Sequence, residues 1–279
     1  MTALTQKAEE IRPIVHRTSG QAHGAFTRLA SPSDLGERLK PFVFVDLFDT
    51  GGREFPGFGL HPHSGIATLT YIAEGSVSYE DTNGARGLLR AGGTEWMRAG
   101  HGVWHGGGAG EPGPARGFQL WVALPSHLEL GPSVSVYQGA NDLPIAGPAR
   151  VLLGSYDGAT SAIKTSSDIN YMAVRLKAGQ HWRHTPPSGH AVLWVAIGKG
   201  AVRTPKRIRH GELAIFAHCE DPVEFVANSD AEFMLGSAVP HPHDLVLGRY
   251  SVHTSGDALR KGEQRIREIQ AELTREGRL

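Results

Sequence analysis

Turn-forming residues recur along most of this chain at intervals too short for long helices. The chain has 36 glycines and 17 prolines among 279 residues. From Gly65 onward, turn signals such as Asn83-Gly84 and Gly92-Gly93 arrive about every eight or nine positions. The segments between them, such as Ile66 to Ile72, are rich in β-branched and aromatic residues and therefore favour strands. This pattern predicts an all-β chain of many short strands, arranged as sandwiches or barrels.

The strand pattern occurs twice, which predicts two tandem β-domains. In the first half, the expected strands include Ile66 to Ile72, Trp96 to Trp104 and Phe118 to Leu124. A passage rich in Gly, Pro and Asn follows, and we place the boundary within it, with residues 1–145 in the first domain and 146–279 in the second. In the second half, the expected strands are Tyr171 to Leu176, Ala191 to Ile197, Leu213 to Ala217 and Phe233 to Leu235. A weak internal repeat relates Leu69 to Val77 with Val192 to Val202.

Residues 257–279 have a different pattern from the rest of the chain. Leu259, Ile266, Ile269 and Leu273 recur at helical spacing, with charged residues between them. We predict a C-terminal amphipathic α-helix whose apolar stripe packs against one of the β-domains. A helix that binds a partner is the alternative interpretation.

Charge and cysteine content limit the expected partners and location. Lys plus Arg is 28 and Asp plus Glu is 28, so the net charge is 0, and direct nucleic-acid binding is not expected. A short basic run from Arg203 to Arg209 lacks interleaved aromatic residues and fits a solvated loop. No run approaches the roughly 18 apolar residues that would cross a bilayer. Charged residues within Met1 to Phe26 argue against a signal peptide, and Cys219 is the single cysteine, so we expect a cytoplasmic protein without membrane contact.

Two histidines just before a predicted strand form the first candidate site. In His61-Pro62-His63, the histidines are two residues apart, so in an extended chain both side chains project from one face. Pro62 favours that extended conformation for itself and for His61. A further donor can come from His101 or His105, near the end of another predicted strand. If that strand lies beside the first, two or three imidazoles converge on one metal with open coordination positions.

These residues resemble the pirins, two-domain members of the cupin superfamily. The resemblance includes Pro41 to Phe48, His61-Pro62-His63 with Gly65, Trp96 to Gly100, His105 and Leu120 to Val122, together with the closing helix. It implies two tandem cupin (double-stranded β-helix) barrels with a C-terminal α-helix and a metal site in the first barrel. Pirins hold iron or another divalent metal through three histidines and a glutamate. The resemblance therefore implies His61, His63 and His105 as ligands here.

The glutamate positions of the family are not acidic in this chain. The ligand glutamate belongs two residues after the third histidine, where this chain has Gly107. A second glutamate, four residues after the second histidine in most members, is replaced by Ala67. Loss of a carboxylate predicts weaker metal binding and one more open position.

Four explanations for the missing carboxylate stay open. His101 swings in as a fourth ligand, Glu111 reaches in from the glycine-rich loop, three histidines and water suffice, or the site has decayed. We expect a divalent transition metal, with iron favoured and nickel, copper or zinc as alternatives. Gln119 and Trp121 are candidate pocket residues, and no catalytic residue is assigned.

Histidines of the second half are interpreted as structural or surface groups. His241-Pro242-His243 repeats the first motif but has no returning strand behind it. When the internal repeat is extended, His61-Pro62-His63 falls on Pro186-Pro187-Ser188, so we expect no metal in the second barrel. His181, His184 and His190 flank that region and fit loop positions.

The resemblance implies two classes of function. Some pirins are similar to quercetinases, which open the ring of a flavonol, so a dioxygenase acting on a small aromatic substrate is the first hypothesis. A non-catalytic regulatory protein that contacts a protein partner through a weak or degenerate metal site is the second. The sequence leaves open whether the chain is an enzyme.

Overall fold

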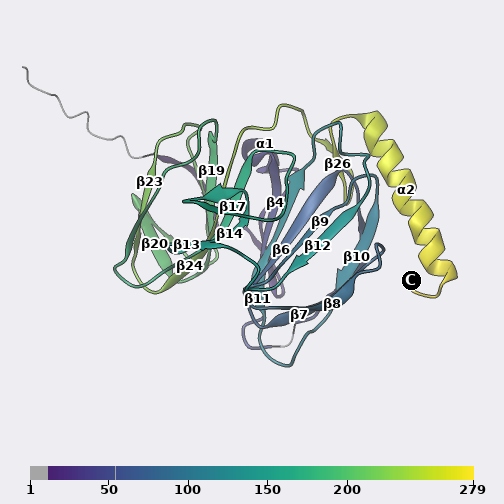
Figure 1. Ribbon diagram of the computed structural model, residues 1–279, viewed down its shortest axis with the longest axis horizontal. Helices are drawn as coiled ribbons and strands as arrows, with labels where there is room; N and C mark the ends of the chain where they lie inside the picture. Colours follow the sequence, from purple (N-terminus) through teal and green to yellow (C-terminus); the bar gives the residue numbers. More distant parts are fainter. Residues whose placement is uncertain (1–11, 54) are drawn as a thin grey trace, which may run out of the picture.

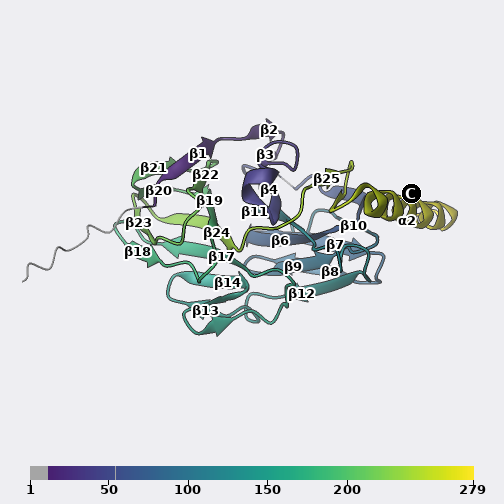
Figure 2. The ribbon, with the colours of Figure 1, turned by 90° about the horizontal axis from the view of Figure 1, so that it is seen from above.

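The computed structural model describes residues 12–53 and 55–279. Our expectation of no signal peptide within Met1 to Phe26 therefore lies partly outside the described residues. Figure 1 shows two β-rich parts side by side, with the one long helix along the outer edge of the first part. Seen from above in Figure 2, that helix lies at the opposite end of the molecule from the four-stranded sheet of the second part.

The first part contains a seven-stranded and a four-stranded antiparallel sheet. The seven-stranded sheet has, in spatial order, β12 (Val134–Gln138), β9 (Thr94–Arg98), β6 (Ile66–Glu74), β11 (Arg116–Ala123), β4 (Phe42–Asp49), β3 (Phe26–Ala30) and β2 (Gln21–His23). The four-stranded sheet has β5 (Phe58–His63), β10 (Val103–Gly107), β7 (Ser76–Asp81) and β8 (Arg86–Arg90).

The second part likewise contains a seven-stranded and a four-stranded antiparallel sheet. Its seven-stranded sheet has β1 (Ile14–Thr18), β22 (Leu213–Phe216), β19 (Val192–Lys199), β24 (Ala231–Ala238), β17 (Ile169–Leu176), β14 (Ala149–Leu153) and β13 (Ile145–Ala146). Its four-stranded sheet has β18 (His181–His184), β23 (Val223–Ala227), β20 (Ala201–Thr204) and β21 (Lys206–Arg209). The remaining elements are two short hairpins and two helices: β15 (Ser155–Tyr156) with β16 (Ala159–Thr160), β25 (Val246–Leu247) with β26 (Val252–His253), α1 (Gly36–Leu39) and α2 (Gly256–Arg275).

The two parts correspond strand by strand. Strands β6 and β19 hold the same place in their sheets, and each turns into the next strand through a glycine with positive φ, Gly75 at 74° and Gly200 at 71°. A Cβ at either glycine would lie 2.1 to 2.2 Å from a backbone oxygen, so no other residue fits there. The internal repeat in the sequence is thus a repeat of structure. The N-terminal strand β1 occupies in the second sheet the place that β12 occupies in the first.

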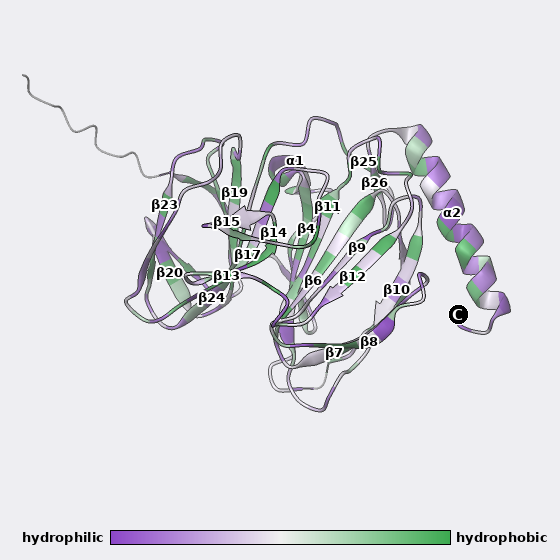
Figure 3. Ribbon diagram, viewed as in Figure 1, coloured by the Kyte–Doolittle hydropathy of each residue, from purple (hydrophilic) through white to green (hydrophobic). Residues whose placement is uncertain are grey.

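The two seven-stranded sheets share one apolar core. Alternate residues of the central strands, including Leu69 and Leu120 of the first part and Tyr171 and Trp194 of the second, belong to a single buried cluster. Phe42 contacts Trp194 edge to face, with ring centroids 5.5 Å apart. Figure 3 shows the hydrophobic colour concentrated on these central strands. Each four-stranded sheet covers the other face of its large sheet, and the sheets are open rather than closed into cylinders.

The β-rich fold class with one C-terminal helix is confirmed, but one predicted strand is wrong. The run Trp96 to Trp104 divides into the end of β9 and the start of β10, with a turn at residues 99–102. Gly100 has φ of 54°, and a Cβ there would lie 2.2 Å from the Gly131 oxygen, so this turn requires glycine. His101 therefore lies in a turn and does not share a strand face with His105.

Helix α2 packs on β10 of the first part. Ser255 caps its first turn by accepting a hydrogen bond from the Ala258 amide, and Trp104 Nε1 donates to the Ile266 oxygen at 2.9 Å. Ile269 and Leu273 bury their side chains against Trp104. Of the helices in the described part of the chain, neither is long and apolar enough to cross a membrane.

A buried hydrogen-bonded cluster holds the segment before α2 to the first part. Ser64 Oγ lies 3.0 Å from His253 Nε2, and His253 Nδ1 lies 3.2 Å from Glu129 Oε2. Glu129 also accepts hydrogen bonds from the amide and the hydroxyl of Thr254, each at 2.7 Å. This order of groups is that of a Ser–His–acid triad, but all three side chains are at most 3% exposed. We call Ser64, Glu129, His253 and Thr254 the His253 cluster. Helix α2 covers this cluster through Gly262, so the role of the cluster is to hold the segment before α2 in place.

Glu129→Ala should destabilise the protein by about 3 kcal/mol, because it leaves the buried His253 and two partly buried donors of Thr254 without an acceptor. Denaturant unfolding of the metal-free protein measures this change. Glu268→Ala, on the exposed face of α2, is the control and should change the free energy of unfolding by less than about 0.5 kcal/mol. Equal effects of the two substitutions would contradict the assigned role of the cluster.

Candidate metal centre

Strand pairing brings the three predicted histidines together. In the antiparallel pair of β5 and β10, His105 lies directly opposite His61, and Val103 lies opposite His63. The rings of His61 and His105 are 4.5 Å apart between centroids, and His63 is 5.0 and 5.1 Å from them. One nitrogen from each ring lies within 4.8 Å of the other two. Among the described residues, His61, His63 and His105 are therefore the group that could hold a metal ion. The geometry agrees with convergence at one point.

Hydrogen bonds orient all three rings in the same sense. The Nδ1 atoms of His61, His63 and His105 face the Gly59 oxygen at 2.8 Å, the Tyr250 oxygen at 2.9 Å and the Glu95 carboxylate at 3.2 Å, respectively. Since all three partners are acceptors, each Nδ1 carries the proton and each Nε2 keeps its lone pair. The Nε2 atoms of His63 and His105 are buried without a hydrogen-bond partner. Leaving such atoms unpaired is costly, and a metal ion would satisfy them.

Burial also favours the neutral form of these imidazoles. It lowers the pKa of His61 to about 4, with a further lowering from His105, and lowers the pKa of His63 well below its usual value. A neutral imidazole is the form that binds a metal. The donor set therefore fits a divalent transition metal.

A cavity of about 270 Å³ opens beside the histidines. Aromatic side chains form much of its wall, and among them Phe44 and Trp121 are stacked with centroids 4.2 Å apart. Gln119 and Trp121, the residues that the sequence offers as pocket candidates, both line it, as do His61 and His105. Arg249 and Tyr250 close one side from the C-terminal segment.

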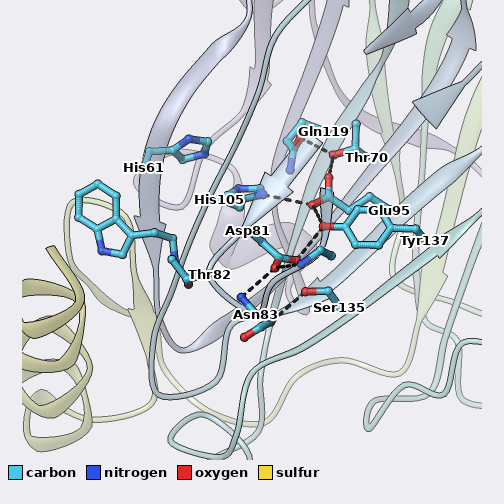
Figure 4. Close-up of polar contacts among 12 residues, drawn as sticks. His61, Thr70, Asp81, Thr82, Asn83, Glu95, His105, Gln119, Ser135 and Tyr137 are labelled. Carbon is cyan, nitrogen blue, oxygen red and sulfur yellow. Dashed lines mark hydrogen bonds and ion pairs between the residues drawn. The ribbon is translucent and has the colours of Figure 1, made fainter. Parts of the chain in front are cut away.

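A row of polar side chains crosses the large sheet behind this cavity. Each member lies opposite the next on the adjacent strand, in the order Arg28, Asp46, Gln119, Thr70, Glu95 and Tyr137. All except Tyr137 line the cavity, and Figure 4 shows the end of this polar row that reaches His105, from Gln119 to Tyr137. The sequence patterns did not mark Arg28, Asp46, Thr70 and Glu95 as site residues. The available signal was a charged residue inside an otherwise apolar strand, as with Asp46 in Phe42–Asp49.

Glu95 is the acidic residue of the row that contacts a candidate ligand. Burial alone would raise its pKa, but hydrogen bonds from His105 and Thr70 lower it below the ordinary value. Glu95 is therefore ionised at neutral pH. Its carboxylate is bonded to the outer nitrogen of His105, so it supports the site through that ring.

The other residues that the sequence offered as a fourth ligand, and the two family glutamate positions, bring no further donor to the three histidines. A Cβ at Gly107 would lie 2.3 Å from the Ser78 oxygen, so no side chain fits at that position. Ala67 faces the core between the two large sheets. Glu111 is exposed and paired with Arg90 at 2.7 Å. His101 is neither in the three-histidine group nor among the residues that line the cavity.

The second part has a different set of residues at the corresponding place. Strands β5 and β10 of the first part correspond to β18 and β23 of the second. His63 lies opposite Val103, the first residue of β10, and His184 lies opposite Val223, the first residue of β23, so His63 corresponds to His184. Trp182 and Phe225 then occupy the places of His61 and His105. The sequence overlay on Pro186-Pro187-Ser188 is therefore wrong. Seven residues separate β18 from β19, against two between β5 and β6, and this longer loop shifts the alignment.

The remaining histidines of the second half are dispersed, and the predicted loop position is wrong for His181 and His184, which are the two ends of strand β18. His190 bonds to Ser237 and Asp168, His181 is exposed, and His241 is buried beside His243 with ring centroids 5.4 Å apart. The basic run between Arg203 and Arg209 forms the hairpin of β20 and β21 rather than the predicted loop, with its basic side chains exposed and Ile208 buried.

The paired sheets and the three-histidine group define a cupin-type protein with a candidate metal centre. The family model "Pirin" matches residues 24–122. A pirin-like protein of Caulobacter vibrioides is 30% identical over 257 residues, covering 82% of this chain and 88% of that one. A Pseudomonas aeruginosa protein named "Putative quercetin 2,3-dioxygenase PA3240" is 37% identical over 192 residues, covering 64% of this chain and 67% of that one. The chain belongs to the pirin family.

Solved structures support the same conclusion about the fold. A crystal structure of quercetin 2,3-dioxygenase from Acinetobacter baumannii superposes with a TM-score of 0.84 at 26% identity, covering 91% of this chain and 96% of that one. Bacterial pirin YhhW from Escherichia coli, solved in complex with nickel(II), has a TM-score of 0.63 at 21% identity, covering 79% and 94%. This second likeness concerns the fold alone.

Nickel(II) should stabilise this protein through the three histidines. A metal at 100 times its dissociation constant adds about 2.7 kcal/mol, which corresponds to roughly 5–10 °C in Tm. Thermal unfolding with nickel(II) and with a chelator measures the shift within each variant, so any change in metal-free stability cancels. His63→Ala should abolish the shift, whereas the exposed His127→Ala should retain it. A full shift in His63→Ala would rule out this site.

Burial of the Asp46 carboxyl makes stability depend on pH. Burial raises the pKa of Asp46 from 3.8 to about 6, although Arg28 opposes the change. Because the folded pKa exceeds the unfolded one, the contribution of Asp46 is full below about pH 3.8 and is lost as the pH rises through about 6. Between these limits, wild type should lose up to about 3 kcal/mol relative to Asp46→Asn in denaturant unfolding. A pH-independent difference between the two proteins would contradict the raised pKa.

Proposed function

We propose that this chain is a metal-dependent dioxygenase that acts on a small oxygenated aromatic molecule of the flavonol type. The observation that carries the proposal is the position of the three imidazoles, whose unprotonated nitrogens converge beside an aromatic-walled cavity. The names of the Pseudomonas relative and of the Acinetobacter structure support this reaction class. The chain would act in the cytoplasm.

The three histidines would hold the metal, and the cavity walls would hold the substrate. When bound, a divalent transition metal such as iron, nickel, copper or zinc supplies Lewis-acid polarisation of an oxygen donor and open coordination positions. Phe44 and Trp121 line the cavity and would give a planar ring apolar contact close to His63, whose ring centroid is 4.8 Å from that of Trp121.

The polar row would set the orientation of that substrate. Gln119 and Arg28 offer side-chain donors toward oxygen atoms along one edge of a ring, while Asp46 can accept from a hydroxyl group. Tyr250 and Arg249 also line the cavity and would limit the entry of water. Together these groups favour a planar molecule with several oxygen substituents.

A non-catalytic regulatory or interaction role is the second candidate. The observation that favours it is the closed space at Gly107, where the Ser78 oxygen excludes the carboxylate expected from the family pattern. In a flavonol-cleaving enzyme, a ligand carboxylate is the expected base for the flavonol hydroxyl. Metal binding without turnover would support this second candidate.

Oxygen uptake in the presence of quercetin distinguishes the two candidates. The metal-loaded wild type should consume oxygen in proportion to quercetin, and His61→Ala should reduce the rate by at least about 100-fold. Trp121→Ala should raise KM more than it lowers kcat, because it removes apolar contact that the ground state and the transition state share. His127→Ala serves as the control. Equal rates in wild type and His61→Ala would exclude this site as the catalytic centre.

A further inference from the structure

The carboxylate of Glu95 is buried between the metal-binding group and the large sheet. The side chain is 8% exposed, and it lines the cavity beside His105. One oxygen accepts from His105 Nδ1 at 3.2 Å, and the other lies 2.9 Å from Thr70 Oγ1 (Figure 4). Both oxygens therefore have a partner within the site.

Other acidic side chains near the cavity are committed to different partners. Asp46 is paired with Arg28 at 2.6 Å, and Asp81 accepts from Tyr137 at 2.8 Å and from two backbone amides of its own turn. The family position at Gly107 has no room for a side chain. Glu95 is thus the carboxylate that is in contact with a ring of the three-histidine group.

Strand register fixes Glu95 in place. Thr70 and Tyr137 lie directly opposite it on the two neighbouring strands. Thr70 has one hydroxyl proton, which we assign to the charged carboxylate rather than to Gln119 Oε1 at the same distance of 2.9 Å. Tyr137 is stacked on Tyr79 with centroids 3.8 Å apart, and its hydroxyl lies 3.4 Å from Glu95. A carboxylate with such neighbours has little freedom to rotate.

We propose that Glu95 is the positioning residue of the metal centre and replaces, from the outer side of His105, the ligand carboxylate that this chain lacks. It holds the proton of His105 on Nδ1, so that Nε2 points toward His61 and His63. It also places one negative charge behind that ring, which strengthens His105 as a donor to a divalent cation. This inference rests on the proposed metal site.

The consequence is measurable without any substrate. Carboxylates that hydrogen-bond to a metal-ligating histidine contribute about 10- to 100-fold in metal affinity. Glu95→Gln keeps the shape of the side chain and an oxygen acceptor but removes the charge, whereas Glu95→Ala removes both. Both variants should bind cobalt(II) at least about 10-fold more weakly than wild type, with the larger loss in Glu95→Ala.

Calorimetric titration of the metal-free proteins with cobalt(II) tests the proposal, and the visible absorption of the cobalt(II) forms reports on ligand geometry. The control is Glu111→Gln, which removes an exposed carboxylate and should leave both affinity and spectrum unchanged. A change in Tm of the metal-free protein alone would indicate a merely structural role. Wild-type affinity and spectrum in folded Glu95→Gln would overturn the proposal.

Two further variants separate the possible failures. If Glu95→Gln did not fold, Thr70→Val would decide between the outcomes. Loss of the hydroxyl that restrains the carboxylate should also weaken cobalt(II) binding. Unchanged cobalt(II) affinity in Thr70→Val would overturn the proposal. If wild type bound no metal, the metal site and this inference would fall together. If wild type bound metal, His61→Ala did not, and Glu95→Gln bound as wild type, the role of Glu95 alone would be disproved.

Discussion

The in-register pairing of strands in the first large sheet is the constraint on which the rest of the site depends. Six consecutive strands place the polar row at one level, so that each member touches or faces the next. A shift of one residue in any central strand would exchange its two faces. In β6, for example, Thr70 would enter the apolar core and Leu69 would enter the cavity. The apolar core between the two large sheets therefore fixes the chemistry on the opposite face.

The two parts have one architecture but use their interiors differently. In the second part, the space between the sheets is filled by apolar side chains such as Val174, Leu193, Phe225 and Phe233. The corresponding space in the first part contains the polar row, the three histidines and the cavity. His184 is the histidine that the second part keeps at a corresponding position, and burial lowers its pKa to about 3. The fold thus permits a site in either part, and the side chains decide which part has one.

The sequence was sufficient for those features that depend on neighbouring residues. Turn glycines and apolar runs predicted most of the strands, and the spacing of His61 and His63 predicted that they share a face. The role of Glu95 was not predicted because β9 is covered on both faces, so alternation between apolar and polar residues does not mark the cavity side. The split between β9 and β10 was missed because the turn at Gly100 depends on contact with Gly131, far along the chain.

The orientation of the three histidines depends on contacts at very different sequence separations. His61 is oriented by Gly59 two residues away, His105 by Glu95 on β9, and His63 by the oxygen of Tyr250, which is 187 residues distant. Tyr250 is in turn held by the segment that the His253 cluster and α2 attach to the first part. An isolated first domain would retain the donors but would lose the partner that orients His63. Since a site assembled in this way does not exist in the unfolded chain, binding of a metal there would be coupled to folding of the whole chain. The closing helix therefore contributes to the candidate metal centre although none of its residues lies among the candidate ligands.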